Sequence, residues 1–128
     1  MGDGTALGQV RGHGSAKDGS HHWWQQRLTA GGNLILVLWF LISIALLPTY
    51  SFAALSAWLA SPLAAIPMLL LVFSTFYHFR LGLQVVIEDY QHDESRVVLL
   101  ILLNFFTIAA GTTAIFSILK IAFTAGAA

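Results

Sequence analysis

The chain has 128 residues, of which 57% are hydrophobic and only 9% are charged, a balance outside the range of ordinary soluble domains. Acidic and basic residues cancel, so no strongly basic surface favours nucleic acid as a partner, and the absence of cysteine excludes disulfides, thiolate zinc sites and iron–sulfur clusters held by this chain alone. The composition is that of an integral membrane protein.

The N-terminal residues are more polar than the rest of the chain. Residues 1–19 are rich in glycine and lack the apolar core of a signal peptide, so we predict a flexible leader. Segment 20–27 is predicted to be a short interfacial turn capped by Ser20, because Trp23 and Trp24 suit the headgroup layer. An initial methionine without a transit peptide favours a bacterial inner membrane over a mitochondrial one.

A long uncharged stretch predicts two membrane crossings. No Asp, Glu, Lys or Arg lies between Leu28 and Phe79, whereas about 20 residues suffice for one crossing. We predict the first helix over 28–47, ended by a proline, and an uncharged connection over 49–61 at the opposite interface.

A second and a third helix complete the predicted fold. The Ser-Pro pair at 61 and 62 is a typical helix start, and this helix is expected to continue to Asp89 or Tyr90. It would then be roughly 40 Å long and leave the hydrocarbon layer, which is about 30 Å thick. After a short loop over 91–95, a helix over 96–123 makes residues 28–128 an all-α membrane domain with three transmembrane helices.

Basic residues predict the orientation of this domain. Arg11, Lys17 and Arg27 precede the first helix and Arg96 follows the second, whereas the intervening connection has no basic residue. The positive-inside rule then places the N-terminus on the cytoplasmic side. Lys120, near the end of the third helix, is the one basic residue that does not fit this orientation.

His78 is an ionisable residue inside an apolar run, which is costly without a partner or a function. Eleven residues further on stands Asp89, which returns to within about 20° of the same helix face, roughly 16 Å along the axis. Two explanations of His78 stay open: a hydrogen bond across the helix bundle, or axial ligation of a haem. If the iron has two histidine ligands, the second must come from another polypeptide.

The face around His78 is made of small and apolar residues that let a flat partner approach closely. A haem edge fits this face, but a neighbouring helix is the commoner explanation. A weakly polar stripe on the third helix is also interpreted as helix packing. The first face comprises Leu71, Ser74, Thr75, Gly82 and Val85, and the stripe comprises Asn104, Thr107, Ala110, Gly111 and Ala114.

Charged and phenolic residues near the cytoplasmic interface suggest further contacts. Arg27, together with His21, could hold haem propionates, although it also obeys the positive-inside rule. Tyr90 could donate a hydrogen bond to a quinone carbonyl while Asp89 relays protons, or be an ordinary interfacial tyrosine. Arg80 is expected to snorkel to the inner interface or to pair with a partner subunit.

The run from His78 through Arg80, Gly82 and Gln84 to Asp89-Tyr90 resembles the signature of the D-type hydrophobic membrane anchor subunits of succinate dehydrogenase, respiratory complex II. An upstream pattern, with His21 and the Arg-Leu-Thr-Ala run from residue 27, is similar to that family as well. With three helices of matching length, the resemblance covers nearly the whole chain.

The resemblance implies a function in electron transport and the tricarboxylic acid cycle. His78 falls on the axial ligand of haem b, Tyr90 on the ubiquinone-contacting tyrosine with Asp89 beside it, and Arg27 and His21 on residues near the haem propionates. The implied partners are a second anchor, the cytochrome b556 subunit, an iron–sulfur subunit and a flavoprotein carrying FAD. This chain would have no catalytic activity alone.

Two other functions stay open at this point. In a cofactor-free structural or assembly subunit of a respiratory complex, His78 would only hydrogen-bond to a neighbouring helix. A cytochrome b subunit of another quinone-linked dehydrogenase would usually carry several intramembrane histidines, whereas one is predicted here.

Overall fold

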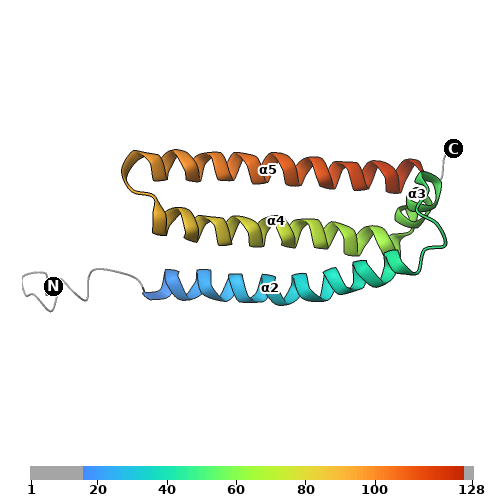
Figure 1. The fold of residues 1–128 in the computed structure, drawn as a ribbon, viewed down its shortest axis with the longest axis horizontal. Helices are drawn as coiled ribbons and strands as arrows, with labels where there is room; N and C mark the ends of the chain where they lie inside the picture. Colours follow the sequence, from blue (N-terminus) through green and yellow to red (C-terminus); the bar gives the residue numbers. More distant parts are fainter. Residues whose placement is uncertain (1–15, 126–128) are drawn as a thin grey trace, which may run out of the picture.

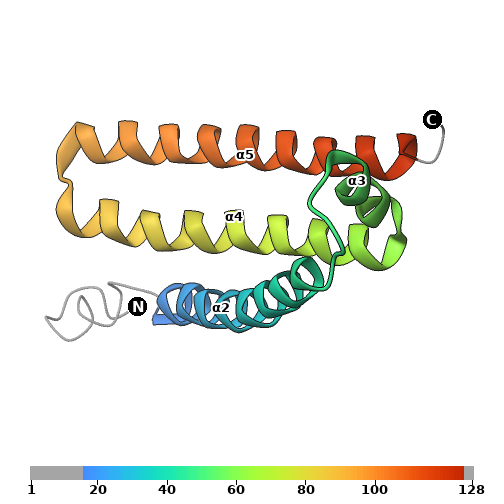
Figure 2. The same ribbon diagram turned by 45° about the vertical axis from the view of Figure 1, so that its right-hand side comes forward.

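The computed structural model describes residues 16–125, and within that range the chain is entirely helical apart from its connections. The elements are α2 (Ala16–Ala45), α3 (Phe52–Ala60), α4 (Pro62–Tyr90) and α5 (Asp93–Thr124). The three long helices lie side by side with α4 in the middle, and the short α3 lies across one end of the bundle (Figures 1 and 2). The predicted all-α class is confirmed.

The three long helices are apolar enough to cross a membrane over the segments Gly19–Ala45, Pro62–Tyr90 and Asp93–Thr124. Many large apolar side chains point away from the bundle, among them Ile35 and Phe105, both 70% exposed. In water such surfaces would be unfavourable, whereas lipid or another membrane chain covers them without cost. The prediction of three membrane helices is therefore confirmed by length and composition.

The first helix begins earlier than the sequence predicts. It starts at Ala16 rather than near Leu28, so the segment 20–27 is continuous with the membrane helix and Ser20 lies inside α2 instead of capping a separate turn. No proline interrupts this stretch, and glycines are common within membrane helices. Most of the predicted leader, residues 1–15, lies outside the described residues.

The predicted uncharged connection contains a helix that the sequence analysis missed. The Ser51 hydroxyl accepts a hydrogen bond from the backbone N–H of Ala54 at 3.2 Å and so caps the start of α3. The Trp58 ring then stacks on Trp39 of α2, with 6.0 Å between ring centroids. Helix α3 therefore closes the end of the bundle opposite the α4–α5 turn (Figure 1).

The turn between α4 and α5 is shorter than predicted. Only Gln91 and His92 separate the two helices, and α5 begins at Asp93 rather than at Arg96. Asp93 has a φ of 57°, in the left-handed region that aspartate tolerates better than most residues. With Glu94 it places two carboxylates in the first turn of α5, where the helix dipole favours negative charge.

The weakly polar stripe on α5 packs against α4. Thr107 and Gly111 are buried, and a Cβ atom on Gly111 would lie 3.6 Å from the Phe76 ring. Leu81 of α4 is the most deeply buried large side chain among the described residues, at 1% exposure. The packing interpretation is therefore confirmed for Thr107 and Gly111.

Candidate functional site

The small-residue face of α4 lies against α2. Three close approaches define an antiparallel register: Gly32 lies opposite Ser74, Thr29 opposite His78, and the Gln26 amide opposite Gly82. A Cβ atom on Gly82 would lie 3.3 Å from Gln26 Nε2, so a larger residue there would make the Gln26 side chain shift by a few tenths of an ångström. Helix packing is thus what the structure shows for this part of the face.

His78 lies within this contact and is half-buried. Its Nδ1 atom is 3.0 Å from Thr29 Oγ1 on α2. The Thr29 hydroxyl is also 2.8 Å from the carbonyl oxygen of Gln25 in its own helix. Within residues 16–125 no hydrogen bond to Nε2 of His78 is present, so one imidazole nitrogen is engaged across the bundle and the other stays available.

Other polar residues of α2 share this face. His22, Gln26, Thr29 and Asn33 are three or four residues apart, a spacing that places them on one side of a helix. Three buried atoms among them, His22 Nε2, Gln26 Oε1 and Asn33 Oδ1, have no hydrogen-bond partner within the described part of the chain. Buried polar atoms normally have a hydrogen-bond partner, so these three atoms are an exception within the bundle.

Arg27 and His21 were predicted as site residues on this helix, whereas the polar row itself was not predicted. The available signal was the three- and four-residue spacing of polar side chains in an otherwise apolar helix.

Asp89 and Tyr90 lie at the last turn of α4, and the Tyr90 side chain is 76% exposed. The start of α2 and the α4–α5 turn lie at the same end of the bundle (Figure 1). His78 is roughly 16 Å from Asp89 along the helix axis, so the two do not touch. Nearby, Gln84 Nε2 donates to Glu88 Oε1 at 2.9 Å along the surface of α4.

Arg27 and His21 are both exposed on α2. The Arg27 guanidinium lies 5.1 Å from the centroid of the Trp23 ring, a cation–π contact. The register of α2 against α4 puts Arg27 close to the level of His78, and His21 nearer to the Asp89 end. The predicted site residues therefore share one half of the bundle, but the chain alone does not bring them into contact.

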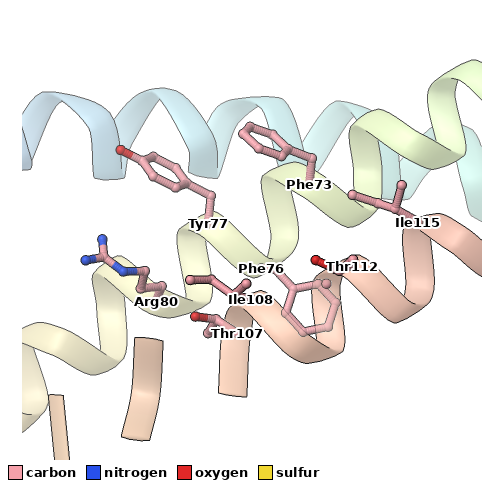
Figure 3. A pocket seen from close by; sticks show the side chains of 9 residues that line it. Phe73, Phe76, Tyr77, Arg80, Thr107, Ile108, Thr112 and Ile115 are labelled. Carbon is pink, nitrogen blue, oxygen red and sulfur yellow. The ribbon is translucent and has the colours of Figure 1, made fainter. Parts of the chain in front are cut away.

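Arg80 makes a contact that the sequence analysis did not predict. Its Nε donates to Oδ1 of Asn104 on α5, and the Asn104 amide in turn donates to the Leu100 carbonyl oxygen at 2.8 Å. A groove of about 260 Å³ lies alongside, between α4 and α5, with Phe73 and Tyr77 among its lining residues (Figure 3). Arg80 is thus held by a partner within the chain.

Comparison with known proteins identifies relatives over most of the chain. Residues 1–120 match the family model described as succinate dehydrogenase/fumarate reductase transmembrane subunit. A succinate dehydrogenase hydrophobic membrane anchor subunit of Rickettsia bellii is 42% identical over 97 residues, which are 74% of this chain and 77% of the relative. The corresponding subunit of Rickettsia conorii is 33% identical over 113 residues, 84% of this chain and 90% of the relative.

No solved structure matches the chain significantly. The family match extends over all but the last few residues, and these relatives are matched over more than three quarters of their own length. The resemblance deduced from the His78–Tyr90 motif is confirmed, and the chain belongs to the family of succinate dehydrogenase/fumarate reductase transmembrane subunits.

Proposed function

We propose that this chain is a membrane anchor subunit of a succinate:quinone oxidoreductase, the role that its Rickettsia relatives bear in their names. His78 supports a role in haem binding as well. It is an intramembrane imidazole whose Nδ1 atom is hydrogen-bonded to Thr29 and whose Nε2 atom is available. An imidazole held in this way suits ligation of haem iron.

The residues present fit the haem b that the family implies. Among the described histidines, His21 and His22 lie near the start of α2 and His92 lies in the α4–α5 turn, which leaves His78 as the one at membrane depth. No second histidine lies at the depth of His78 within residues 16–125, so the second axial ligand would come from the other anchor, the cytochrome b556 subunit. Arg27 and His21 would hold the propionates.

The bound haem would supply a one-electron carrier beside the quinone site, and the chain's own residues would handle hydrogen bonds and protons. The Tyr90 phenol would donate a hydrogen bond to a ubiquinone carbonyl. Asp89, exposed at the end of α4, would pass protons from the aqueous side toward the quinone. Both positions lie where a helix longer than the hydrocarbon layer reaches water.

The remaining parts of the reaction belong to partner subunits. FAD and iron–sulfur clusters would be carried by the flavoprotein and the iron–sulfur subunit, and this chain by itself would not catalyse succinate oxidation. The exposed apolar faces of α2, α4 and α5 fit the lipid bilayer and the second anchor. We place the complex in a bacterial inner membrane, with the start of α2 on the cytoplasmic side.

Purification of the chain from its native membrane under mild detergent tests the assignment. We expect a tag on this chain to copurify a flavoprotein, an iron–sulfur protein and a second membrane subunit, with succinate:quinone reductase activity in the preparation. The partners should be identified by mass spectrometry. Copurification with the subunits of a different dehydrogenase would contradict the proposal.

The orientation leads to a separate prediction. A reporter that is active only in the cytoplasm should be active when fused after Asp93 and inactive when fused after Ser56, because Arg27 and Arg96 lie at the first of these ends and a single basic residue, Lys120, lies at the second. Activity in the reverse pattern would place the Tyr90 end on the other side of the membrane.

A cofactor-free assembly subunit is the second candidate, and the Thr29–His78 hydrogen bond is the observation that favours it. In that role the imidazole would only join α2 to α4. Colour distinguishes the two candidates, because a purified complex with haem absorbs in the Soret region and changes its spectrum on reduction. A colourless active complex would favour the cofactor-free role.

A further inference from the structure

The Thr29 hydroxyl lies between its own helix and His78. Its oxygen is 2.8 Å from the Gln25 carbonyl oxygen, 3.1 Å from that of Gln26, and 3.0 Å from Nδ1 of His78. The hydroxyl has one hydrogen to donate and two lone pairs with which to accept. Three neighbours therefore compete for a single proton.

The local geometry decides where that proton goes. Threonines in helices commonly donate to the carbonyl oxygen four residues earlier, and here this contact, to Gln25, is the shortest of the three. With the hydroxyl proton on α2, the oxygen accepts from Nδ1–H of His78. A neutral imidazole with its hydrogen on Nδ1 carries its free lone pair on Nε2, the atom that has no hydrogen bond within residues 16–125.

We infer that Thr29 is a positioning residue: it holds His78 as the Nδ1–H tautomer and so keeps the Nε2 lone pair free for a metal ion. The inference rests on the proposed function, in which that metal is haem iron. Ligating histidines generally donate their second ring N–H to an acceptor that fixes the tautomer and the ring orientation.

The packing of α2 on α4 supports this role. On one side of the Thr29–His78 contact, Gly82 faces the Gln26 amide, with 3.3 Å between a built Cβ and Gln26 Nε2. On the other side, Gly32 lies close to Ser74, with 3.8 Å between a built Cβ and the serine oxygen. The missing side chains at Gly32 and Gly82 leave room for α2 and α4 to approach on both sides of the contact, where the hydroxyl lies within hydrogen-bond distance of the imidazole.

Two substitutions separate the hydroxyl from the shape of the side chain. Thr29→Val keeps the branched shape and removes the acceptor, whereas Thr29→Ser keeps the hydroxyl. Loss of such an acceptor typically weakens metal binding about 10- to 100-fold. We expect Thr29→Val to lower haem content in the purified complex and to shift the haem midpoint potential to more positive values, because a less basic imidazole stabilises ferric iron less. Thr29→Ser should resemble the unmodified protein in both measurements.

Thr113→Val is the matched control. The Thr113 hydroxyl also donates to the carbonyl four residues earlier, at 2.8 Å to Ala109, but it lies exposed on α5 with no further hydrogen bond in the described range. This variant should leave the haem spectrum and the potential unchanged. Haem content, the reduced-minus-oxidised spectrum and a potentiometric titration are measured on all variants.

The outcomes distinguish this inference from the proposed function. Unchanged haem content and potential in Thr29→Val would overturn the positioning role while leaving haem ligation by His78 intact. If Thr29→Val does not assemble, Thr29→Ala is compared with Thr29→Ser, because these two differ only in the hydroxyl. If Thr29→Ala and Thr29→Ser have the same haem content and midpoint potential, Thr29 acts only in packing and the inference is overturned. Absence of haem from the unmodified complex would instead refute haem ligation by His78, the part of the proposed function on which the inference rests.

Discussion

Replacement of His78 by alanine is expected to remove most of the haem from the purified complex. In the proposed function the substitution takes away one axial ligand, and it also removes the hydrogen bond between His78 and Thr29. Changes to groups that only support a ligand reduce metal affinity about 10- to 100-fold, so loss of the ligand itself should cost about 100-fold or more. Haem content per complex and the reduced-minus-oxidised spectrum report the effect directly.

His92→Ala is the control for this variant. His92 is exposed in the α4–α5 turn, and its hydrogen bond to Ser95 uses the backbone carbonyl, which alanine keeps. This variant should retain a normal haem spectrum. If His78→Ala shows the spectrum and haem stoichiometry of the unmodified complex, His78 is not a haem ligand, and its bond to Thr29 is structural.

The helical architecture could be predicted because membrane helices depend on local properties of the sequence. An uncharged run longer than one crossing, a Ser-Pro start and an apolar third segment predict three helices without knowledge of how they pack. The ends were predicted less well. Helix α2 extends back to Ala16 and α5 begins at Asp93, since helical hydrogen bonding continues beyond the apolar span wherever no residue interrupts it.

The residues of the candidate site also differ in whether local sequence is enough to predict them. His78 stands out in the sequence because an ionisable side chain in an apolar run is unusual. Thr29 does not stand out and Asn104 appears only as one member of a weakly polar stripe, because the importance of each depends on which residue faces it on another helix. The register that pairs Thr29 with His78, and Asn104 with Arg80, is set by side-chain packing between helices and is not encoded in any local pattern.

The chain also contains only part of its own proposed site. Tyr90 is largely exposed, and Asp89 is exposed beside it at the end of α4. A quinone headgroup needs a pocket that excludes water on several sides, so in the proposed function the remaining walls would come from partner subunits. Asp89 and Tyr90 were therefore predicted from their helical register with His78, their place at the membrane interface and the family motif, and not from a cavity.

Tyr90→Phe is expected to lower quinone reduction while leaving the upstream reaction intact. The substitution removes only the phenolic hydroxyl and keeps the ring. If that hydroxyl donates to a quinone carbonyl, its loss should cost about 1–3 kcal/mol of binding or transition-state stabilisation, roughly a 5- to 150-fold effect. Quinone reductase activity is compared with succinate oxidation by an artificial acceptor that takes electrons before the membrane subunits, which should stay near normal.

Two further variants make this comparison decisive. Tyr50→Phe is the matched control, because Tyr50 is also exposed, at 64%, but lies at the opposite end of the bundle beside α3, and it should have no effect. Asp89→Asn removes a proton-accepting carboxylate at nearly constant volume, so it should lower kcat for quinone reduction more than it raises KM. Unchanged quinone reduction in Tyr90→Phe, or an equal fall of both activities, would make Tyr90 an interfacial structural residue, since a group that only anchors the subunit cannot separate the two reactions.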